Sequence, residues 1–156
     1  CRMSEPGDAA APALSPGLRY AEDAEAVAAC FPVMRQLRPH LASPGELVER
    51  WRRQAEAGYR LLAAWQGGQP VALAGFRLQE NLVHGRFLYV DDLVTDAAVR
   101  SAGHGAGLLA AVAAEGRRLG IGRLVLDTPL DNVLGHRFYY RQGLLARALR
   151  FSMPLA

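Results

Sequence analysis

The pattern of apolar and polar positions changes its period several times along the chain. From Leu18 onward, segments with alternating or continuous apolar residues are interleaved with segments whose apolar residues recur every three or four positions. The first kind of segment predicts strands and the second predicts helices. The predicted strands span 18–20, 60–65, 70–78, 86–94, 123–127 and 145–151, and the predicted helices span 23–37, 43–57, 105–119 and 134–142.

Local signals support several of these boundaries. Asp23 is suited to cap the first helix, and Pro39 follows its predicted end. Ser43 and Glu46 have the spacing of a capping box, with Pro44 at the first helical position of the second helix. The predicted helix starts therefore have chemical support in addition to the periodicity.

The order β-α-α-β-β-β-α-β-α-β predicts one mixed α/β domain, of the α+β kind, over residues 17–156. The chain has 156 residues, no internal repeat, and no linker long enough to divide this range. Residues 1–16 are rich in Ala, Pro, Ser and Gly without periodicity, which predicts a flexible tail.

The charge and composition narrow the class of protein. Hydrophobic residues make up 51% of the chain and charged residues 21%, as in ordinary soluble proteins. The net charge is +3, and all 18 basic residues are arginines scattered along the chain, which argues against a nucleic-acid partner. We found no apolar run of about 18 residues and no apolar core of a signal peptide, so we predict a cytoplasmic protein without a membrane partner.

The cysteines and histidines do not form a metal-binding pattern. Cys1 and Cys30 belong to no Cys-x-x-Cys or Cys/His cluster, so we expect neither a structural zinc site nor a disulfide framework. Cys30 is predicted to be a reduced thiol in the core. The histidines, at positions 40, 84, 104 and 136, have no suitably spaced partners, and no metal is predicted.

The stretch from Arg100 to Val112, RSAGHGAGLLAAV, places three glycines directly before and within the start of a predicted helix. Backbone N–H groups at a helix N-terminus are unpaired, and glycines let an anion approach them. A tight turn without any ligand is the alternative interpretation. If a phosphate binds here, a P-loop is excluded because the chain contains no Lys.

A dinucleotide site fits part of this pattern. Gly105 to Ala110 matches G-x-G-x-x-A, and Asp127 ends the next predicted strand about twenty residues later. Two observations count against it. Residues 95–102 separate the glycines from the preceding strand, and the chain after the loop is too short to complete a doubly wound sheet.

Two motifs resemble a known family. The segment Leu93-Val94-Thr95, followed by Arg100-x-x-Gly103-x-Gly105, is similar to the acetyl-CoA signature of the GNAT superfamily of N-acetyltransferases. Downstream, the run from Asn132 to Leu144 is similar to that family's Asn-x-x-Ala-x-x-Phe-Tyr-x-x-x-Gly-Phe signature. The departures from the usual motifs are mild: Thr95 for Val, Ala97 for Pro, Ser101 for Gly and Leu144 for Phe.

This resemblance implies a GNAT-like fold with a mostly antiparallel central sheet flanked by helices. It also implies an acyltransferase that moves an acetyl group from acetyl-CoA to a primary amine by direct attack in a ternary complex. Acetyl-CoA is then a cosubstrate, and the acceptor is a small molecule or a peptide amine. A homodimer is left open. The implied cofactor-binding residues are Leu93, Val94, Thr95, Arg100, Ser101, Ala102, Gly103, His104, Gly105, Ala106, Gly107, Asn132 and Tyr139.

The resemblance assigns roles within this set. Tyr139 stands where the family's general acid protonates the expelled thiolate, although a core aromatic is the other interpretation. The backbone at the end of strand 87–94, splayed by a bulge, would meet the thioester carbonyl and place Leu93 and Val94 beside the acetyl arm. Asn132 would contact the cofactor arm or cap its helix.

Asp91 and Asp92 are adjacent carboxylates in an otherwise apolar strand. Either is a candidate base or a binding group for a cationic amine, and the alternation of strand side chains suggests that only one faces the reaction centre. Asp127 is interpreted as structural. The arginines that could recognise an acidic acceptor, although solvated arginines are more common, are Arg35, Arg38, Arg50, Arg52 and Arg53.

Two other functions stay open at this point. One is a non-catalytic module of the same fold that binds acyl-CoA, and the other is the small NAD-binding domain considered above. The identity of the amine acceptor, the choice between the two aspartates and the oligomeric state are not determined by these patterns.

Overall fold

The computed structural model describes residue 10 and residues 13–156, so the predicted tail at 1–16 lies mostly outside the described residues. The chain divides into two compact units, residues 1–125 and residues 126–156, which are described separately below. The mixed α/β class predicted from the sequence is confirmed.

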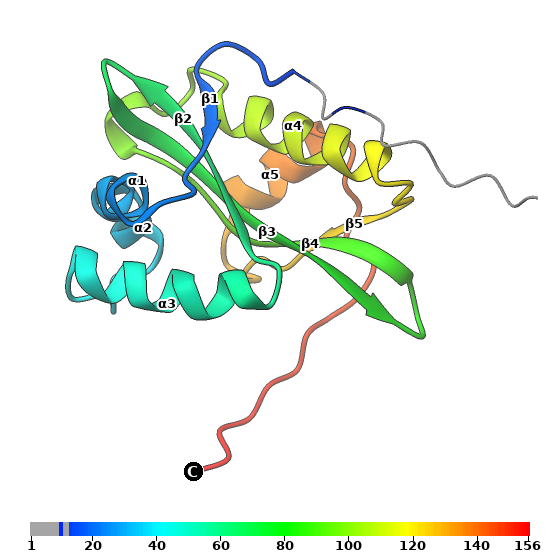
Figure 1. The fold of residues 1–156 in the computed structure, drawn as a ribbon. Coiled ribbons are helices and arrows are strands. Elements are labelled where there is room, and N and C mark those ends of the chain that lie inside the picture. Colours follow the sequence, from blue (N-terminus) through cyan, green and yellow to red (C-terminus); the bar gives the residue numbers. More distant parts are fainter. Residues whose placement is uncertain (1–9, 11–12) are drawn as a thin grey trace, which may run out of the picture. The chain divides into compact units, whose positions relative to one another are not determined.

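The first unit is built on a sheet in which neighbours in sequence are neighbours in space, in the order β1-β2-β3-β4-β5. The pairings of β1 with β2, β2 with β3, and β3 with β4 are antiparallel. The long β3–β4 hairpin therefore lies in the middle of this sheet (Figure 1). The strands are β1 (Leu18–Tyr20), β2 (Arg60–Gln66), β3 (Gln69–Asn81), β4 (Gly85–Thr95) and β5 (Leu124–Leu126).

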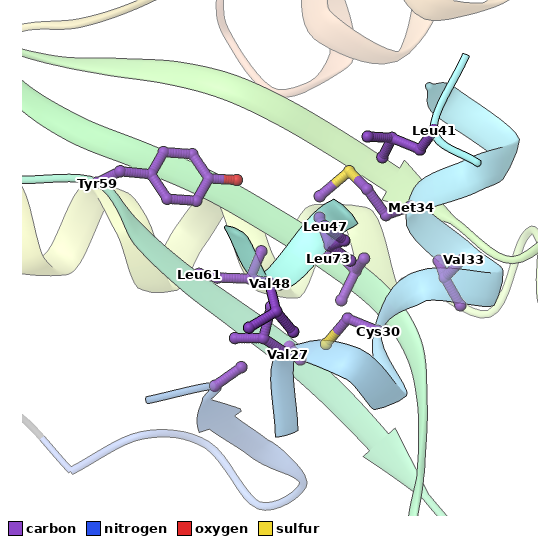
Figure 2. Close-up of a cluster of buried hydrophobic side chains, with 12 residues drawn as sticks. Val27, Cys30, Val33, Met34, Leu41, Leu47, Val48, Tyr59, Leu61 and Leu73 are labelled. Atoms are coloured by element: carbon purple, nitrogen blue, oxygen red, sulfur yellow. The ribbon is translucent and has the colours of Figure 1, made fainter. Parts of the chain in front are cut away.

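Helices cover both faces of this sheet (Figure 1). On one face lie α1 (Ala24–Ala29), α2 (Phe31–Leu37) and α3 (Pro44–Glu56), and α4 (His104–Arg118) packs against β2, β3 and β4. Leu61 and Leu73 belong to the buried cluster under the first three helices, together with Val27 and Cys30 (Figure 2). Burial of these apolar side chains is the main force holding helices to sheet.

The predicted helix over 23–37 is wrong in one respect, because the structure has two helices that meet at Cys30. Pro32 lies in the first turn of α2 and has no N–H to continue the hydrogen-bond ladder of α1. Cys30 itself is the buried free thiol that was predicted, and its Sγ donates to the carbonyl of Ala26 at 3.2 Å. Burial raises the pKa of this thiol to about 12, so it is unreactive at neutral pH.

The predicted capping box at the start of α3 is confirmed with one change. The Ser43 hydroxyl accepts from the N–H of Glu46 at 3.1 Å, and the Glu46 carboxylate accepts from the N–H of Ala42 at 2.7 Å. The glutamate thus reaches the residue before the cap. Both bonds fix where the chain turns into α3.

The second unit contains α5 (Val133–Arg141). The strand predicted over 145–151 is wrong, because residues 144–156 have no secondary structure and Leu149 and Phe151 are exposed. A strand is stable only when a neighbour satisfies its backbone groups and covers one of its faces, and an alternating pattern supplies neither. In the part of the chain that the structure describes, no helix is long and apolar enough to cross a membrane.

Candidate active site

The loop before α4 is the first part of the candidate site. β4 ends at Thr95, a short 3₁₀ turn spans Ala97–Val99, and α4 begins at His104. Ser101 and Gly103 have φ values of 72° and 80°, in the left-handed region. Two left-handed residues so close together turn the chain sharply before α4, where residues 101–103 are exposed and residues 104–106 are partly exposed.

The N-terminus of α4 has no side-chain cap. The first intrahelical bond runs from the N–H of Gly107 to the carbonyl of Gly103, at 3.0 Å. Within the described chain, the backbone N–H groups of residues 101–106 donate to no acceptor. By contrast, α1, α3 and α5 are capped by Asp23, Ser43 and Asn132. The free donors, together with the positive end of the helix dipole, suit a bound anion.

The surroundings of this turn leave room for such an anion. A Cβ placed on Gly107 would meet no atom within 4 Å, and residues 101–103 are exposed. Nε2 of His104 is buried without a hydrogen-bond partner among the described residues. Arg100 is exposed at the end of the 3₁₀ turn, so its guanidinium can reach an anion at the loop. These features fit a phosphate-bearing cosubstrate.

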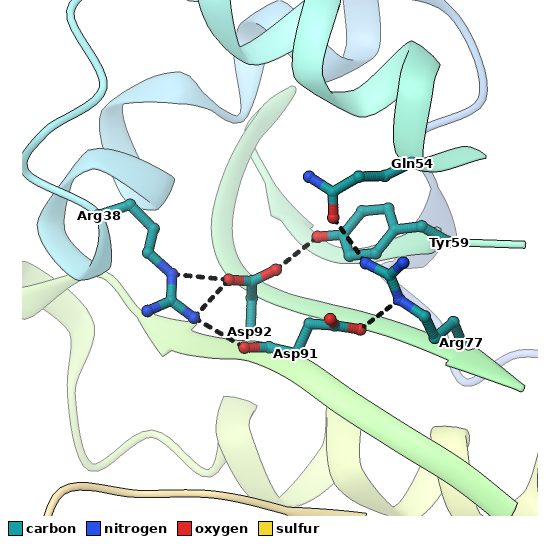
Figure 3. Close-up of polar contacts among 6 residues, drawn as sticks. All are labelled: Arg38, Gln54, Tyr59, Arg77, Asp91 and Asp92. Atoms are coloured by element: carbon teal, nitrogen blue, oxygen red, sulfur yellow. Dashed lines mark hydrogen bonds and ion pairs between the residues drawn. The ribbon is translucent and has the colours of Figure 1, made fainter. Parts of the chain in front are cut away.

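The second part of the candidate site is a bulge in β4. Gly75 of β3 pairs with Asp92, whereas the next residue, Phe76, pairs with Val90. Asp91 is therefore the extra residue of a β-bulge. A bulge interrupts the alternation of side chains, and both carboxylates enter one network of contacts (Figure 3). The expectation that only one of them faces the reaction centre stays a prediction.

Each aspartate has an arginine partner. Arg38, at the end of α2, donates from Nε to Oδ1 of Asp92 at 2.9 Å and from Nη2 to the backbone carbonyl of Asp91 at 2.8 Å. Arg77, on β3, donates from Nε to Oδ2 of Asp91 at 3.0 Å. It also donates from Nη2 to Oε1 of Gln54 at 2.6 Å, so α3 joins the network.

Tyr59, which follows α3 in the chain, completes the network. Its hydroxyl donates to Oδ2 of Asp92 at 2.8 Å, and the Arg77 guanidinium lies 5.3 Å from the centre of its ring. A Cβ at Gly75 would overlap this ring, so only glycine leaves space for it. Burial, and then the charge of Asp92, raise the pKa of Tyr59 well above its ordinary value, which leaves the phenol protonated as a donor.

The end of β4 lies beyond the bulge. Leu93, Val94 and Thr95 continue the pairing with β3, opposite Ala74, Leu73 and Ala72. Because β5 has three residues and β4 has eleven, β5 cannot cover the whole outer edge of β4.

Tyr139 and Asn132 belong to the second unit. The Tyr139 ring packs edge-on against Phe138 with centroids 5.3 Å apart, and burial raises the pKa of its phenol. Asn132 caps α5: its Oδ1 accepts from the N–H of Gly135 at 3.1 Å. Asp127 pairs with Arg150 at 2.5 Å.

Tyr59, Arg77 and Gln54 were not predicted from the sequence, and Arg38 was predicted either to be solvated or to bind an acidic acceptor. Arg38 binds Asp92, and Arg50 pairs with Glu46 at 2.8 Å, so neither is a free cation for an acidic acceptor. The signal was present in the sequence, since two carboxylates in an apolar strand need cationic partners. Among the described residues, no group of three or more His, Cys, Asp or Glu side chains could hold a metal ion.

Comparisons with known proteins identify the family. Residues 24–144 match the model of the acetyltransferase (GNAT) family. The chain is 30% identical over 131 residues to the uncharacterized N-acetyltransferase YhdJ of Bacillus subtilis, covering 80% of this chain and 89% of that protein.

Solved structures share the fold. An acetyltransferase of Trypanosoma brucei is 22% identical, with a TM-score of 0.74, covering 88% of this chain and 98% of the other. Aminoglycoside N-acetyltransferase AAC(6')-Iy, in complex with CoA, is 16% identical, with a TM-score of 0.77, covering 89% and 94%. The family match over most of the chain identifies the protein as a member of the GNAT family of acetyltransferases.

Proposed function

We propose that the protein transfers an acetyl group from acetyl-CoA to a primary amine, by direct attack of the amine within a ternary complex. The observation that carries this proposal is the uncapped start of α4, where the N–H groups of residues 101–106 have no acceptor in the described chain. A pyrophosphate accepts several hydrogen bonds at once and is favoured by the helix dipole.

The cosubstrate supplies a thioester whose acetyl carbon accepts the nucleophile. The N–H groups of residues 101–106 hold its phosphates, and Arg100 adds a charge-assisted contact. AAC(6')-Iy, which has the same fold, was solved in complex with CoA, and this supports CoA as the carrier of the acetyl group. Leu93 and Val94, at the partly uncovered edge of β4, are proposed to line the acetyl arm and to offer a backbone donor to its carbonyl.

The chain must also move two protons. The acceptor arrives as an ammonium, and one carboxylate of the Asp91/Asp92 pair receives its proton, directly or through water. The neutral nitrogen forms the bond to the acetyl carbon and becomes positively charged, and the carbon–sulfur bond breaks. The nitrogen then releases its second proton to solvent, which leaves a neutral amide, and solvent in turn restores the proton that Tyr139 gives up. The hydroxyl of Tyr139 then gives its proton to the leaving sulfur. The raised pKa of Tyr139 keeps it protonated before the transfer.

The test is an assay of CoA release from acetyl-CoA with a panel of simple amines, amino acids, aminoglycosides and peptides, with the acetylated product identified by mass spectrometry. We expect turnover with at least one amine. Thermal stabilisation by acetyl-CoA without turnover would favour a non-catalytic acyl-CoA module. Stabilisation by NAD(H) and not by CoA would contradict the proposal.

Replacing Tyr139 by Phe tests the general acid. We expect kcat to fall about a hundredfold, because general acids contribute about 10²–10⁴. The Kd for acetyl-CoA should stay within about twofold, since no phosphate contact is lost. Tyr140→Phe, at the exposed neighbouring residue, is the matched control. Equal kcat for Tyr139→Phe and the wild type would refute this role.

A further inference from the structure

The two carboxylates of the β4 bulge are held very differently. Asp92 has both oxygens engaged, Oδ1 by Arg38 and Oδ2 by Tyr59, and its side chain is 13% exposed. Two donors from opposite directions fix its orientation. Asp92 is thus fixed in one orientation and has little freedom to bind another molecule.

Arg38 makes a contact that spans the bulge. Its Nε and Nη2 both lie 2.9 Å from Oδ1 of Asp92, while Nη2 also donates to the backbone carbonyl of Asp91. One guanidinium therefore holds the side chain of one bulge residue and the backbone of the other. The rigid fork of an arginine suits this double contact, which a lysine cannot reproduce.

Asp91 is only half engaged. Arg77 binds Oδ2, whereas Oδ1 makes no hydrogen bond to the described chain, and the side chain is 22% exposed. The groups around it are Arg77 on β3, Asp92 on β4 and Arg38 at the end of α2. Burial raises the pKa of Asp91, Arg77 and Arg38 offset part of that rise, and the charge of Asp92 adds to it.

We propose that Arg38 and Tyr59 clamp Asp92 across the β4 bulge, so that Asp91, through Oδ1, is the carboxylate that receives the ammonium and its proton, and that Arg38 acts on the reaction as a positioning residue. This inference rests on the proposed acetyl transfer. It assigns the two aspartates different tasks: Asp92 holds the backbone, and Asp91 meets the acceptor.

Asp91→Asn and Asp92→Asn separate the two tasks. For Asp91→Asn, kcat/KM for the amine should fall about a hundredfold, and the rise of activity with pH on the acid side should disappear. For Asp92→Asn, that rise should persist and move to lower pH, because the charge of Asp92 raises the pKa of Asp91. Loss of the acid limb in Asp92→Asn, with retention in Asp91→Asn, would overturn the assignment.

Arg38→Met tests the clamp. We expect the amide hydrogens of residues 90–93 to exchange at least about tenfold faster, because a local opening no longer breaks the two contacts of Arg38. The acid limb should move to higher pH, since Arg38 lowers the pKa of Asp91. Arg38→Lys keeps the charge and should give an intermediate exchange rate. It also provides the measurement if Arg38→Met does not fold.

Arg35→Met is the matched control, since Arg35 lies on the same helix, is exposed and makes no contact with either aspartate. In this variant the amide hydrogens of residues 90–93 should exchange as they do in the wild type. Wild-type exchange and an unmoved acid limb in Arg38→Met would overturn the clamp. A wild-type protein that acetylates no amine overturns the proposed function and the role of Asp91 with it. The exchange experiment needs no substrate, so it tests whether Arg38 holds the bulge even if no amine is acetylated.

Discussion

Two polar regions of the first unit differ in how completely their hydrogen-bonding groups are satisfied. In the loop at 101–106, a run of backbone N–H groups has no acceptor in the described chain. At the β4 bulge, Arg38, Tyr59 and Arg77 satisfy three of the four carboxylate oxygens of Asp91 and Asp92. The first region is complete only with a ligand, whereas the second is nearly complete without one. Unsatisfied donors therefore indicate where this chain binds a large anion, and the single open oxygen indicates where it meets a small cation.

The largest effect on acetyl-CoA binding should come from filling the open space at α4. Gly107→Val places a side chain where a Cβ meets no protein atom. It should weaken acetyl-CoA binding about thirtyfold, or ~2 kcal/mol, because the side chain occupies the approach of the phosphates. Isothermal titration calorimetry measures the Kd. Gly122→Val, at another open glycine, is the control, and an unchanged Kd for Gly107→Val would show that the turn does not hold the phosphates.

Filling space at the bulge should lower the stability of the fold, whereas filling space at α4 should weaken ligand binding. Gly75→Ala places a methyl group within the ring of Tyr59, which must move away from Asp92. Crowding of this kind costs about 2 kcal/mol of unfolding free energy. Urea denaturation measures this loss, with Gly122→Ala as the control. A loss within ~0.5 kcal/mol would mean that Tyr59 is not held against Gly75.

Glu115 extends the comparison to a third polar group. This carboxylate on α4 is 8% exposed and pairs with Arg118 at 2.8 Å and Arg60 at 2.9 Å. Because both arginines bind this carboxylate, its replacement in Glu115→Gln should cost about 1–2 kcal/mol of unfolding free energy at neutral pH. Glu49→Gln, at an exposed position of α3, should cost little.

The contribution of Glu115 to stability should change with pH in a defined direction. The hydrogen bonds from Arg118 lower the pKa of Glu115 below its ordinary 4.5. Its contribution to stability is therefore present above about pH 4.5 and is lost as the pH falls through the lowered pKa. The difference in unfolding free energy between the wild type and Glu115→Gln should shrink over that range. A constant difference would contradict the ionised pairing.

The smallest effect concerns the backbone of the loop. Ser101 has a φ of 72°, a conformation that costs a residue with a Cβ about 1 kcal/mol. Ser101→Gly should therefore raise the unfolding free energy by about 0.5–1 kcal/mol and should not weaken acetyl-CoA binding. Thermal unfolding with and without acetyl-CoA measures both. Destabilisation by Ser101→Gly, with Ser152→Gly neutral, would show that the serine side chain matters more than the backbone.

Much of the fold could be predicted from the sequence because periodicity reports which face of an element is buried. The strands around Leu61 and Leu73 and the helix from His104 lie where the pattern placed them. The two errors have local causes. Pro32 breaks the first helix through a single missing N–H, and the alternation at 145–151 has no strand beside it to pair with.

The candidate site was predictable only in part. The glycine motif identified the loop before α4, and the strand containing Asp91 and Asp92 was identified by its buried charges. Their partners could not be predicted, because Arg38 is 54 positions from Asp92 in sequence and is brought there by the packing of α2 on the sheet. The bulge at Asp91 depends on the register between β3 and β4, which one strand alone does not define.

The measurement that tests the central claim most directly is a titration of the ¹⁵N-labelled protein with acetyl-CoA, followed through its backbone amide resonances. We expect the largest shifts at the amides of residues 101–106, which have no acceptor in the described chain, and no comparable shifts with NAD(H). Saturation with acetyl-CoA while these amides stay in place would contradict it.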